Sequence, residues 1–483
     1  MSELVTGSIH IEKIPAQPSV ERILNAFRDE SFLILLDSAT SARSHDSRYT
    51  FLTADPVDVA VILNCSFGDD PFRRLRDWQG QMAVSGDSEL PPFRGGIAGL
   101  MSYDLGNAFE RLPGMAPNGF STPVLAAGLF DWAIVWDHLL STVAFYVIPV
   151  ASGTAEKQAA RVEWIRRRLD SAGLRADTPE TGDTGAGNPG RDSGNDVSGQ
   201  SGGVVGSSDV TYQSSFSRSE YLSAVQKVID YIAAGDIYQV NLSQQLTAPW
   251  AGSGSDLYQR VRTHNAAPFC GLFQTPEFSV VSASPERFLK VRQGCHVETR
   301  PIKGTRRRQQ SPIADLYTAD ELSTSEKDRA ENVMIVDLLR NDISRVCEIG
   351  SVEVTGVCEI EVFETVQHLV STVVGKLRPD CDIWDLCAAC FPGGSITGAP
   401  KLRAMEIIAE LEQTSRGAYC GSLFYCGPDN DFDSSILIRT FVLSSGRVVF
   451  PVGGGVVADS VPQDEFDETL HKASGMLRSL RSE

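Results

Sequence analysis

Runs of apolar residues divide the first third of the chain into strand-length and helix-length segments. Continuous apolar runs of strand length occur at 31–37 and 57–65, and 126–149 has the pattern of a pair of strands. Residues 155–172 instead repeat apolar side chains at helical spacing. This pattern predicts several strands followed by one helix.

Later in the chain the pattern predicts clusters of strands separated by a few helices. Helices are expected at 219–234, with Ser219 as the cap, at about 325–341, with Ser323 and Glu326 as a capping box, and at about 463–480. Strands are predicted at 237–247, 268–274, 278–283, 287–291, 366–375, 418–426, 434–443 and 447–457. Because the strands cluster, we predict an α+β fold with two packed β-sheets, sandwich-like, and helices on the outside.

Composition changes sharply near the middle of the chain. From Gly173 to about residue 209 the sequence is mostly Gly, Ser, Asp, Thr and Pro, which provides too little apolar surface to offset the entropy of ordering. We therefore predict an N-terminal portion at 1–172, a flexible linker at 173–210 and a C-terminal portion at 211–483 that holds nearly all the candidate chemistry.

The overall charge limits the possible partners. The 483 residues contain 43 Lys and Arg against 62 Asp and Glu, so the formal net charge is -19, which argues against bulk binding to nucleic acid or an anionic membrane. An anionic substrate would need local cations or a metal ion. The chain begins without a signal-like segment and has no apolar run near the roughly 20 residues of a membrane span, so we expect a cytoplasmic protein.

A lysine in the stretch ETRPIKGTRRR is the first candidate for chemistry. Lys303 lies between Pro301 and Gly304, where a tight turn after a strand would fix the position of its amine. Such a placement suits a nucleophilic amine. The alternative is a solvated basic turn, because three arginines follow directly.

Acidic residues at helical spacing are candidates for a metal site. Glu465, Glu468 and Lys472 share one stripe of the last predicted helix, and two carboxylates one turn apart suit Mg²⁺. A solvated face with a Glu468–Lys472 ion pair is the alternative. Glu331 lies in line with an apolar stripe of its own helix, where it needs a partner; placement at the helix edge is the ordinary explanation.

Glycine clusters and one arginine are candidates for binding an anion. The loop FPGGSITGAPK, which includes Gly398, lacks the P-loop pattern but precedes a predicted helix, where backbone N–H groups can hold an anion. Gly453 to Gly455 end a predicted strand and would let a ligand approach the backbone. Arg439 lies among apolar residues in a strand, either paired with an acid or holding a substrate carboxylate.

Taken together, these motifs resemble the chorismate-utilising enzymes. The resemblance rests on SASPERF, PIKGT, DRAENVMIVDLLRND, FETVQHLVST, FPGGSITGAPK, SILIRT and GGGVVADS followed by ET and Lys472, and it covers about Phe216 to the C-terminus. The family includes component I of anthranilate synthase, component I of aminodeoxychorismate synthase, isochorismate synthase and salicylate synthase. The resemblance implies the anthranilate synthase component I-like fold, two sheets packed around the active site.

Two positions favour one branch of this family. Water-using members carry a lysine base where this chain has Gln239, which favours a nitrogen nucleophile. Anthranilate synthases carry alanine where this chain has Lys303, so the chain is more similar to aminodeoxychorismate synthase, which serves p-aminobenzoate and folate synthesis.

The resemblance also implies roles for individual residues. Glu286 would be the general acid for the departing 4-hydroxyl, and Thr397 and His368 would line the ring. Mg²⁺ would be held by Glu331 and Glu468, with Glu465 in or beside its shell. The substrate would be held by Tyr425, Arg439, Lys472, Gly398 and the backbone of Gly453, Gly454 and Gly455. Regulatory members bind tryptophan, for which the candidate residues are Asp37, Ser38 and Arg48.

The resulting hypothesis is a complete reaction. Lys303 would add to C2 of chorismate while the 4-hydroxyl leaves, and ammonia would then add at C4 and expel the lysine, giving 4-amino-4-deoxychorismate. No glutaminase set is recognised in the sequence, so ammonia is expected from a separate glutamine amidotransferase subunit. The alternatives are component I of an anthranilate synthase and a non-catalytic tryptophan-binding relative.

Overall fold

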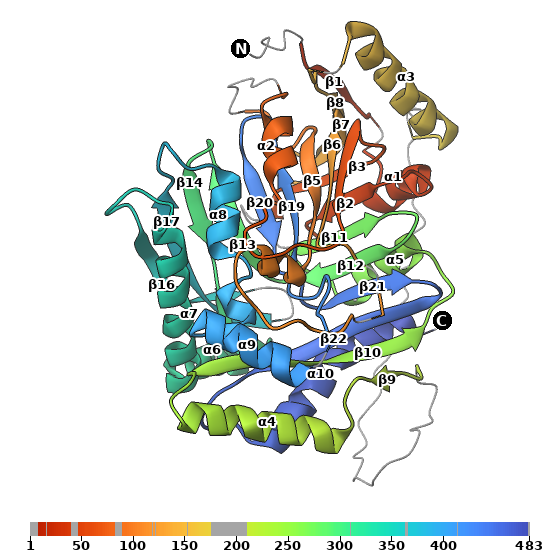
Figure 1. Ribbon diagram of the computed structural model, residues 1–483. Helices are drawn as coiled ribbons and strands as arrows, with labels where there is room; N and C mark the ends of the chain where they lie inside the picture. The colour runs from red at the N-terminus through yellow and green to blue at the C-terminus, as the bar shows by residue number, and fades with distance from the viewer. Residues whose placement is uncertain are drawn as a thin grey trace.

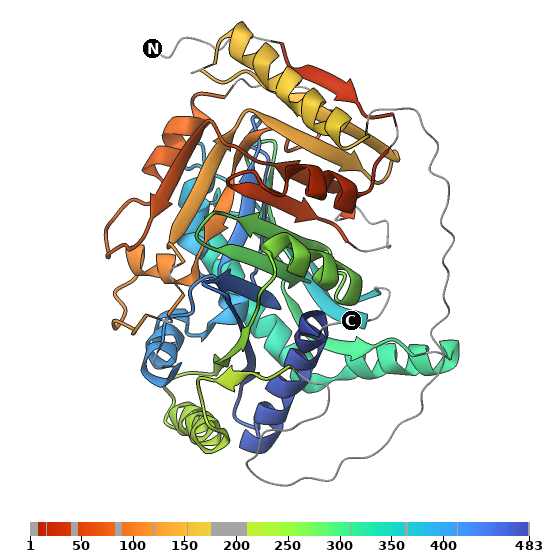
Figure 2. The ribbon, with the colours of Figure 1, turned by 90° about the vertical axis from the view of Figure 1, so that its right-hand side faces the viewer.

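The computed structural model describes residues 8–481 apart from 16, 40–46, 83–88, 118, 121, 152, 175–209, 310, 363–365 and 413. The described residues form two large antiparallel sheets with helices outside them, which is the predicted α+β fold (Figures 1 and 2). Most of the predicted linker at 173–210 lies outside the described residues.

The first sheet has the strand order β1-β8-β7-β3-β2-β11-β12-β21-β22-β10-β18, and β9 also pairs with β10. Its strands are β1 (His10–Lys13), β2 (Leu33–Asp37), β3 (Tyr49–Thr53), β7 (Trp132–Asp137), β8 (Thr142–Val147), β9 (Gln213–Ser214), β10 (Gln239–Pro249), β11 (Phe269–Gln274), β12 (Ser279–Ser284), β18 (Gly398–Ala399), β21 (Thr440–Ser444) and β22 (Arg447–Val456).

The second sheet has the order β15-β17-β14-β13-β20-β19-β5-β6-β4, and β16 also pairs with β17. Its strands are β4 (Asp58–Ile62), β5 (Gly96–Met101), β6 (Leu125–Phe130), β13 (Arg287–Arg292), β14 (His296–Thr299), β15 (Ile302–Arg307), β16 (Glu353–Val362), β17 (Val366–Lys376), β19 (Ser422–Cys426) and β20 (Phe432–Ser435). The region expected to hold two strands, 126–149, therefore contains most of three, which belong to different sheets.

Both sheets contain strands from before and after the predicted linker. In the first sheet β2 pairs with β11, and in the second β5 pairs with β19. The portions 1–172 and 211–483 are thus joined through continuous backbone hydrogen bonding, and the three largest hydrophobic clusters contain residues of both portions.

Helices cover the outer faces of the sheets. They are α1 (Val20–Phe27), α2 (Arg73–Gln79), α3 (Ala155–Ser171), α4 (Arg218–Ala233), α5 (Gly254–His264), α6 (Pro312–Thr324), α7 (Glu326–Ser344), α8 (Ile383–Cys390), α9 (Lys401–Glu412) and α10 (Pro462–Leu480). Figure 1 shows α6 and α7 beside β16 and β17, and α8 packs against α7, whereas α4, α9 and α10 lie along β10 and β22.

Two of the predicted helix caps are wrong by two residues. The cap of α4 is Ser217, which forms a capping box with Glu220, rather than Ser219. The cap of α7 is Ser325, because α6 extends to Thr324 and leaves Ser323 inside its last turn. Each true cap is the last residue with extended backbone before the helix.

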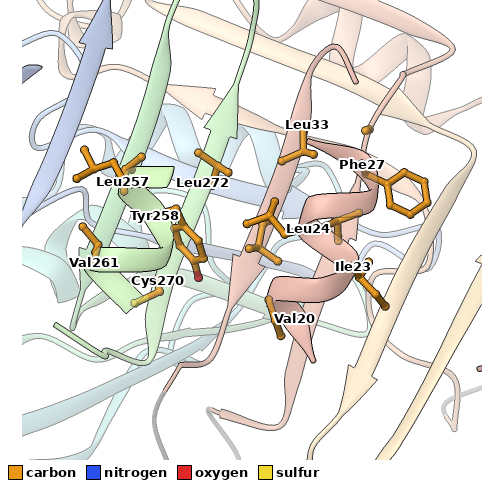
Figure 3. Packing of buried hydrophobic residues seen from close by; sticks show 14 of the residues in the cluster. Val20, Ile23, Leu24, Phe27, Leu33, Leu257, Tyr258, Val261, Cys270 and Leu272 are labelled. Atoms are coloured by element: carbon orange, nitrogen blue, oxygen red, sulfur yellow. The ribbon is translucent and has the colours of Figure 1, made fainter. Parts of the chain in front are cut away.

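The core crosses the boundary between the two portions. In Figure 3, α1 presents Val20, Ile23, Leu24 and Phe27, and α5 presents Leu257, Tyr258 and Val261, over the adjacent strands β2 and β11. All seven side chains are at most 5% exposed. Their burial explains why the amphipathic face of each helix docks here.

Close packing accounts for the glycine-rich segment at 93–104. A Cβ atom on Gly99 in β5 would lie 2.2 Å from the carbonyl oxygen of Ala126 on β6. A residue with a side chain would not fit at this position, so Gly99 allows the backbones of β5 and β6 to approach closely. Among the described helices, none is long and apolar enough to cross a membrane.

Candidate active site

Lys303 lies in a strand and not in the predicted turn. It belongs to β15, whose register with β17 shifts between Ile302 and Thr305. Gly304 in this irregularity has φ of +80°, and a Cβ atom there would lie 2.8 Å from Leu322 and 3.0 Å from Asp328. A bulge of this kind redirects the neighbouring side chain, so the glycine fixes where the Lys303 amine points.

Burial and nearby charges shift the pKa of the Lys303 amine in opposite directions. Burial lowers its pKa, and the carboxylates of Glu331 and Glu286 act in the opposite direction. Its hydrogen-bond acceptor is the carbonyl oxygen of Ser395, at 3.5 Å. A lowered pKa increases the fraction of neutral, nucleophilic amine near neutral pH.

Glu286 has the properties of a proton donor. It lies between β12 and β13, is 6% exposed, and accepts hydrogen bonds from the Ser395 hydroxyl and the Ile302 N–H. Burial raises its pKa to about 7 despite these hydrogen bonds and the nearby charge of Lys303. A carboxyl group with this pKa retains its proton for a substantial part of the time at neutral pH, as a general acid requires.

Three predicted metal ligands lie close enough to influence one another electrostatically. Burial raises the pKa of Glu331 on α7 and of Glu465 on α10, and the charge of Glu468 raises both further. Ser460 donates a hydrogen bond to Glu465 at 2.6 Å. Gly454 faces this group, since a Cβ atom there would lie 3.3 Å from Glu465 Oε2.

The chemistry of this carboxylate group fits a hard divalent cation. Of the two carboxylates with raised pKa values, Glu465 is buried and Glu331 is half-buried. Together with the third carboxylate they are stabilised by added positive charge, and carboxylate oxygens are the ligands that Mg²⁺ prefers. Lys472 supplies part of this charge, because it forms a 2.7 Å ion pair with Glu468 and donates to Gly453 O at 2.9 Å. Within the part of the chain that the structure describes, no three such side chains are close enough to hold a metal ion.

Arg439 is an unpaired cation in a constrained backbone. Its φ is +51°, and in the described ranges it forms neither an ion pair nor a side-chain hydrogen bond. The Arg439 side chain is exposed, yet the protein around it removes part of its hydration, and this desolvation lowers its pKa. The lack of an acidic partner favours the second of the two predicted roles, the binding of a substrate carboxylate.

The other predicted ring-lining residues differ in how they are arranged. His368 on β17 is buried, bonds Thr305 Oγ1 through Nδ1 at 2.8 Å, and has its pKa lowered to about 4 by burial and by the charge of Arg439. Thr397 is fully buried, and its hydroxyl donates to Gly393 O at 3.0 Å. His368 therefore lies beside Arg439, whereas the Thr397 hydroxyl is used within its own loop.

Three of the predicted substrate-binding glycines lie against β10. Cβ atoms on Gly398, Gly453 and Gly455 would meet atoms of β10 at 2.1, 2.5 and 2.2 Å. These glycines are needed for strand packing, which leaves Gly454 as the glycine of the cluster that faces the acidic side chains of α10.

Tyr425 is the predicted substrate-binding residue that the structure places elsewhere. It lines a cavity of about 70 Å³ together with Asp37, Ser38 and Arg48, the residues predicted to bind tryptophan. Its ring lies 5.3 Å from that of Phe51. The strand pairing of β19 with β5 decides this placement, because register determines which sheet face a side chain occupies.

The polar groups of this second cavity are already engaged. Asp37 accepts hydrogen bonds from Thr50, Tyr258 and Arg262 at 2.6–2.8 Å. Arg48 forms a 2.7 Å ion pair with Asp137. The cavity therefore has fixed polar groups beside aromatic side chains.

The buried residues that support Ser395 were not among the predicted site residues. Arg416 and Glu412 form an ion pair, and Arg416 also donates a hydrogen bond to the carbonyl oxygen of Ile396, which follows Ser395 in the chain. Glu412 and Arg416 lie four residues apart, but Gln, Thr and Ser stand between them, so their residue types do not indicate that the pair is buried.

Comparison with known proteins finds a matching family model, similar relatives and a similar solved structure. The family model described as chorismate binding enzyme matches residues 66–478. The chain is 40% identical over 393 residues to aminodeoxychorismate synthase component 1 of Klebsiella aerogenes, covering 81% of this chain and 78% of that protein. It is 39% identical over 412 residues to anthranilate synthase component 1 of Thermus thermophilus, covering 85% and 82%. The crystal structure of anthranilate synthase component I from Streptococcus pneumoniae superposes with a TM-score of 0.74 at 29% identity, covering 90% of this chain and 93% of that one.

Proposed function

Because the chain belongs to the chorismate-binding enzymes, we propose that it is component 1 of an aminodeoxychorismate synthase. It converts chorismate and ammonia to 4-amino-4-deoxychorismate, which serves p-aminobenzoate and folate synthesis. Relatives carrying this name are 34–40% identical to the chain.

The observation that carries the proposal is the pairing of Lys303 with Glu286. A lysine with a lowered pKa and a carboxyl group with a raised pKa interact electrostatically and contact the same residue, Ser395. Environments that shift two pKa values toward each other favour the neutral amine and the protonated acid together, which are the forms a nucleophile and a proton donor need.

These two groups account for each atom in the reaction. The Lys303 nitrogen forms a bond to C2, the two ring double bonds shift, and the C4–O bond breaks while Glu286 gives its proton, so water leaves. Ammonia then forms a bond to C4, the two double bonds return, and the C2–N bond to Lys303 breaks. The proton released by the new ammonium group returns to Glu286. One chorismate and one ammonia yield one aminodeoxychorismate and one water.

Charge must be balanced where the dianionic substrate binds an acidic protein. Arg439 offers an unpaired guanidinium for one carboxylate. Among the described residues no three carboxylates yet form a group that could hold a metal ion. Drawn closer together, Glu331, Glu465 and Glu468 would hold Mg²⁺, which would neutralise the other carboxylate. Lys472 forms an ion pair with Glu468 and so lies beside the same carboxylates.

Ammonia as the nucleophile agrees with the environment of Gln239. This side chain is fully buried, and neither of its polar atoms has a hydrogen-bond partner among the residues that the structure describes. A neutral carboxamide cannot deprotonate water, whereas ammonia needs no base to attack. The ammonia would come from a glutamine amidotransferase subunit, consistent with relatives named as component 1.

Product identification tests the proposal. Purified protein with chorismate, Mg²⁺ and ammonium should form a compound that a lyase converts to p-aminobenzoate, and Lys303→Ala should not form it. Trapping with chorismate followed by mass spectrometry should locate an adduct on Lys303. Formation of fluorescent anthranilate instead would assign the chain to anthranilate synthase, whose component 1 relatives are similarly identical.

We also propose that the cavity around Tyr425 binds tryptophan. Asp37, Ser38 and Arg48 supply polar groups and Tyr425 supplies an aromatic wall. Calorimetric titration should detect tryptophan binding that Ser38→Ala weakens, with exposed Ser219→Ala as a control. Equal affinities in wild type and Ser38→Ala would contradict this site.

A further inference from the structure

A buried arginine holds the loop that contacts both proposed catalytic groups. Arg416 and Glu412 have side chains 1% and 4% exposed, and Arg416 donates to both carboxylate oxygens at 2.6 and 2.8 Å. Arg416 also donates to the carbonyl oxygens of Ile396 at 2.9 Å and Asn241 at 2.7 Å. One planar guanidinium thus joins α9, β10 and the loop before α9.

The loop held in this way contains Ser395, directly before Ile396. The Ser395 carbonyl oxygen accepts from Asn241 Nδ2 at 2.7 Å and from the Lys303 amine at 3.5 Å. The Ser395 hydroxyl hydrogen-bonds to Glu286. Ser395 therefore determines the separation of the amine from the acid.

We propose that Arg416 is a positioning residue, which sets the geometry of Lys303 and Glu286 through Ile396, Asn241 and Ser395. This inference rests on the proposed function of those two groups. Arg416 itself is sealed from solvent, so it does not touch the substrate.

The shape of the arginine explains why no other cation suffices. A guanidinium has five donors in one plane and meets a carboxylate and two carbonyl oxygens simultaneously. A lysine ammonium keeps the charge but has three donors around one point and cannot reach all three groups. Glu412 balances the charge, and its Oε1 also accepts from the Ser243 N–H at 2.8 Å, which anchors the pair to β10.

Arg416→Lys tests the proposal, with Arg94→Lys as its matched control. Arg94 is also 1% exposed and pairs with an acid, Asp429, but contacts neither Ser395 nor Asn241. Arg416→Lys should lower kcat about 100-fold with KM changed less than about threefold, since a displacement near 1 Å can cost this much. Arg94→Lys should keep kcat within about threefold of wild type.

A second measurement does not require turnover. Competitive labelling of amines over a pH range, followed by mass spectrometry, reports the reactivity of Lys303 in the folded protein. Loss of the Ser395 acceptor removes a stabilising contact of the ammonium, so the labelling of Lys303 near pH 7 should rise about threefold in Arg416→Lys. Arg94→Lys should match wild type.

Asn241→Ala keeps the test decisive if Arg416→Lys does not fold. This change removes the other hydrogen bond to Ser395 O and should alter Lys303 labelling in the same direction. Unchanged Lys303 labelling and kcat in the folded variant would overturn the proposal. If the variants alter Lys303 labelling but the wild-type protein makes no aminodeoxychorismate, the positioning role is retained and the proposed function is rejected.

Discussion

Replacing Glu286 by glutamine should change activity and stability in opposite directions. The substitution keeps the size of the side chain and an oxygen that accepts from Ser395 and Ile302, but it removes both the acidic proton and the buried charge. Loss of a general acid typically costs 10²–10⁴-fold in rate. We therefore expect kcat to fall by about that factor.

The stability effect follows from the raised pKa of Glu286. A shift from the ordinary 4.5 to about 7 corresponds to about 3 kcal/mol of penalty on the ionised folded state. Because the folded pKa is the higher one, stability is fully present below pH 4.5 and is lost as pH rises through about 7. Glutamine avoids this loss but also removes the attraction to Lys303, so a net gain of about 1–3 kcal/mol is expected at pH 8.

Urea unfolding at pH 5 and pH 8 measures this difference. The gain of Glu286→Gln over wild type should be less than about 1 kcal/mol at pH 5 and clearly larger at pH 8. Exposed Glu277→Gln serves as the control and should change neither stability nor kcat. A Glu286→Gln protein that is equally active, or that gains nothing between the two pH values, would refute the reasoning.

Three further changes test the remaining parts of the site. Gly304→Ala should destabilise the protein by more than about 1–2 kcal/mol in thermal unfolding and lower kcat at least tenfold. Gly350 has the same φ of +80° but open space around it, so Gly350→Ala should show only the cost of the backbone strain. Equal losses in both variants would contradict a role for the bulge. Arg439→Lys should raise KM for chorismate about tenfold or more in steady-state kinetics, because bidentate bonding is lost, while exposed Arg447→Lys should not; an unchanged KM would exclude Arg439 from the binding of a carboxylate. Glu465→Gln should raise the half-saturating Mg²⁺ concentration about tenfold or more in a magnesium titration of activity, and an unchanged magnesium requirement would remove it from the proposed site.

Local patterns predicted much of the secondary structure. The apolar runs at 31–37, 57–65 and 447–457 are close to β2, β4 and β22, and the helical spacing at 155–172 is α3. The helix α6 was missed because its exposed apolar side chains, including Ile313, Leu316 and Tyr317, give it no clear amphipathic stripe. Local periodicity finds an element only where one face is buried.

The part of the candidate site that depends on residue type alone could be predicted from the sequence. Lys303, Glu286 and Arg439 were named from the sequence, and the structure gives each of them an environment suited to its proposed role. The placement of Tyr425 in a different cavity, and the support of Ser395 by Arg416, could not be predicted. Both depend on which distant segments are paired.

The sequence by itself determined which residues carry charge, where apolar faces recur, and that the chain resembles one family of enzymes. The tertiary structure alone decided that strands from both portions share each sheet, that Lys303 occupies a bulge, and that Tyr425 lines the same cavity as Asp37, Ser38 and Arg48. The physical reason is register: a strand shifted by one residue exchanges its two faces, and this pairing is fixed by contacts between segments hundreds of residues apart.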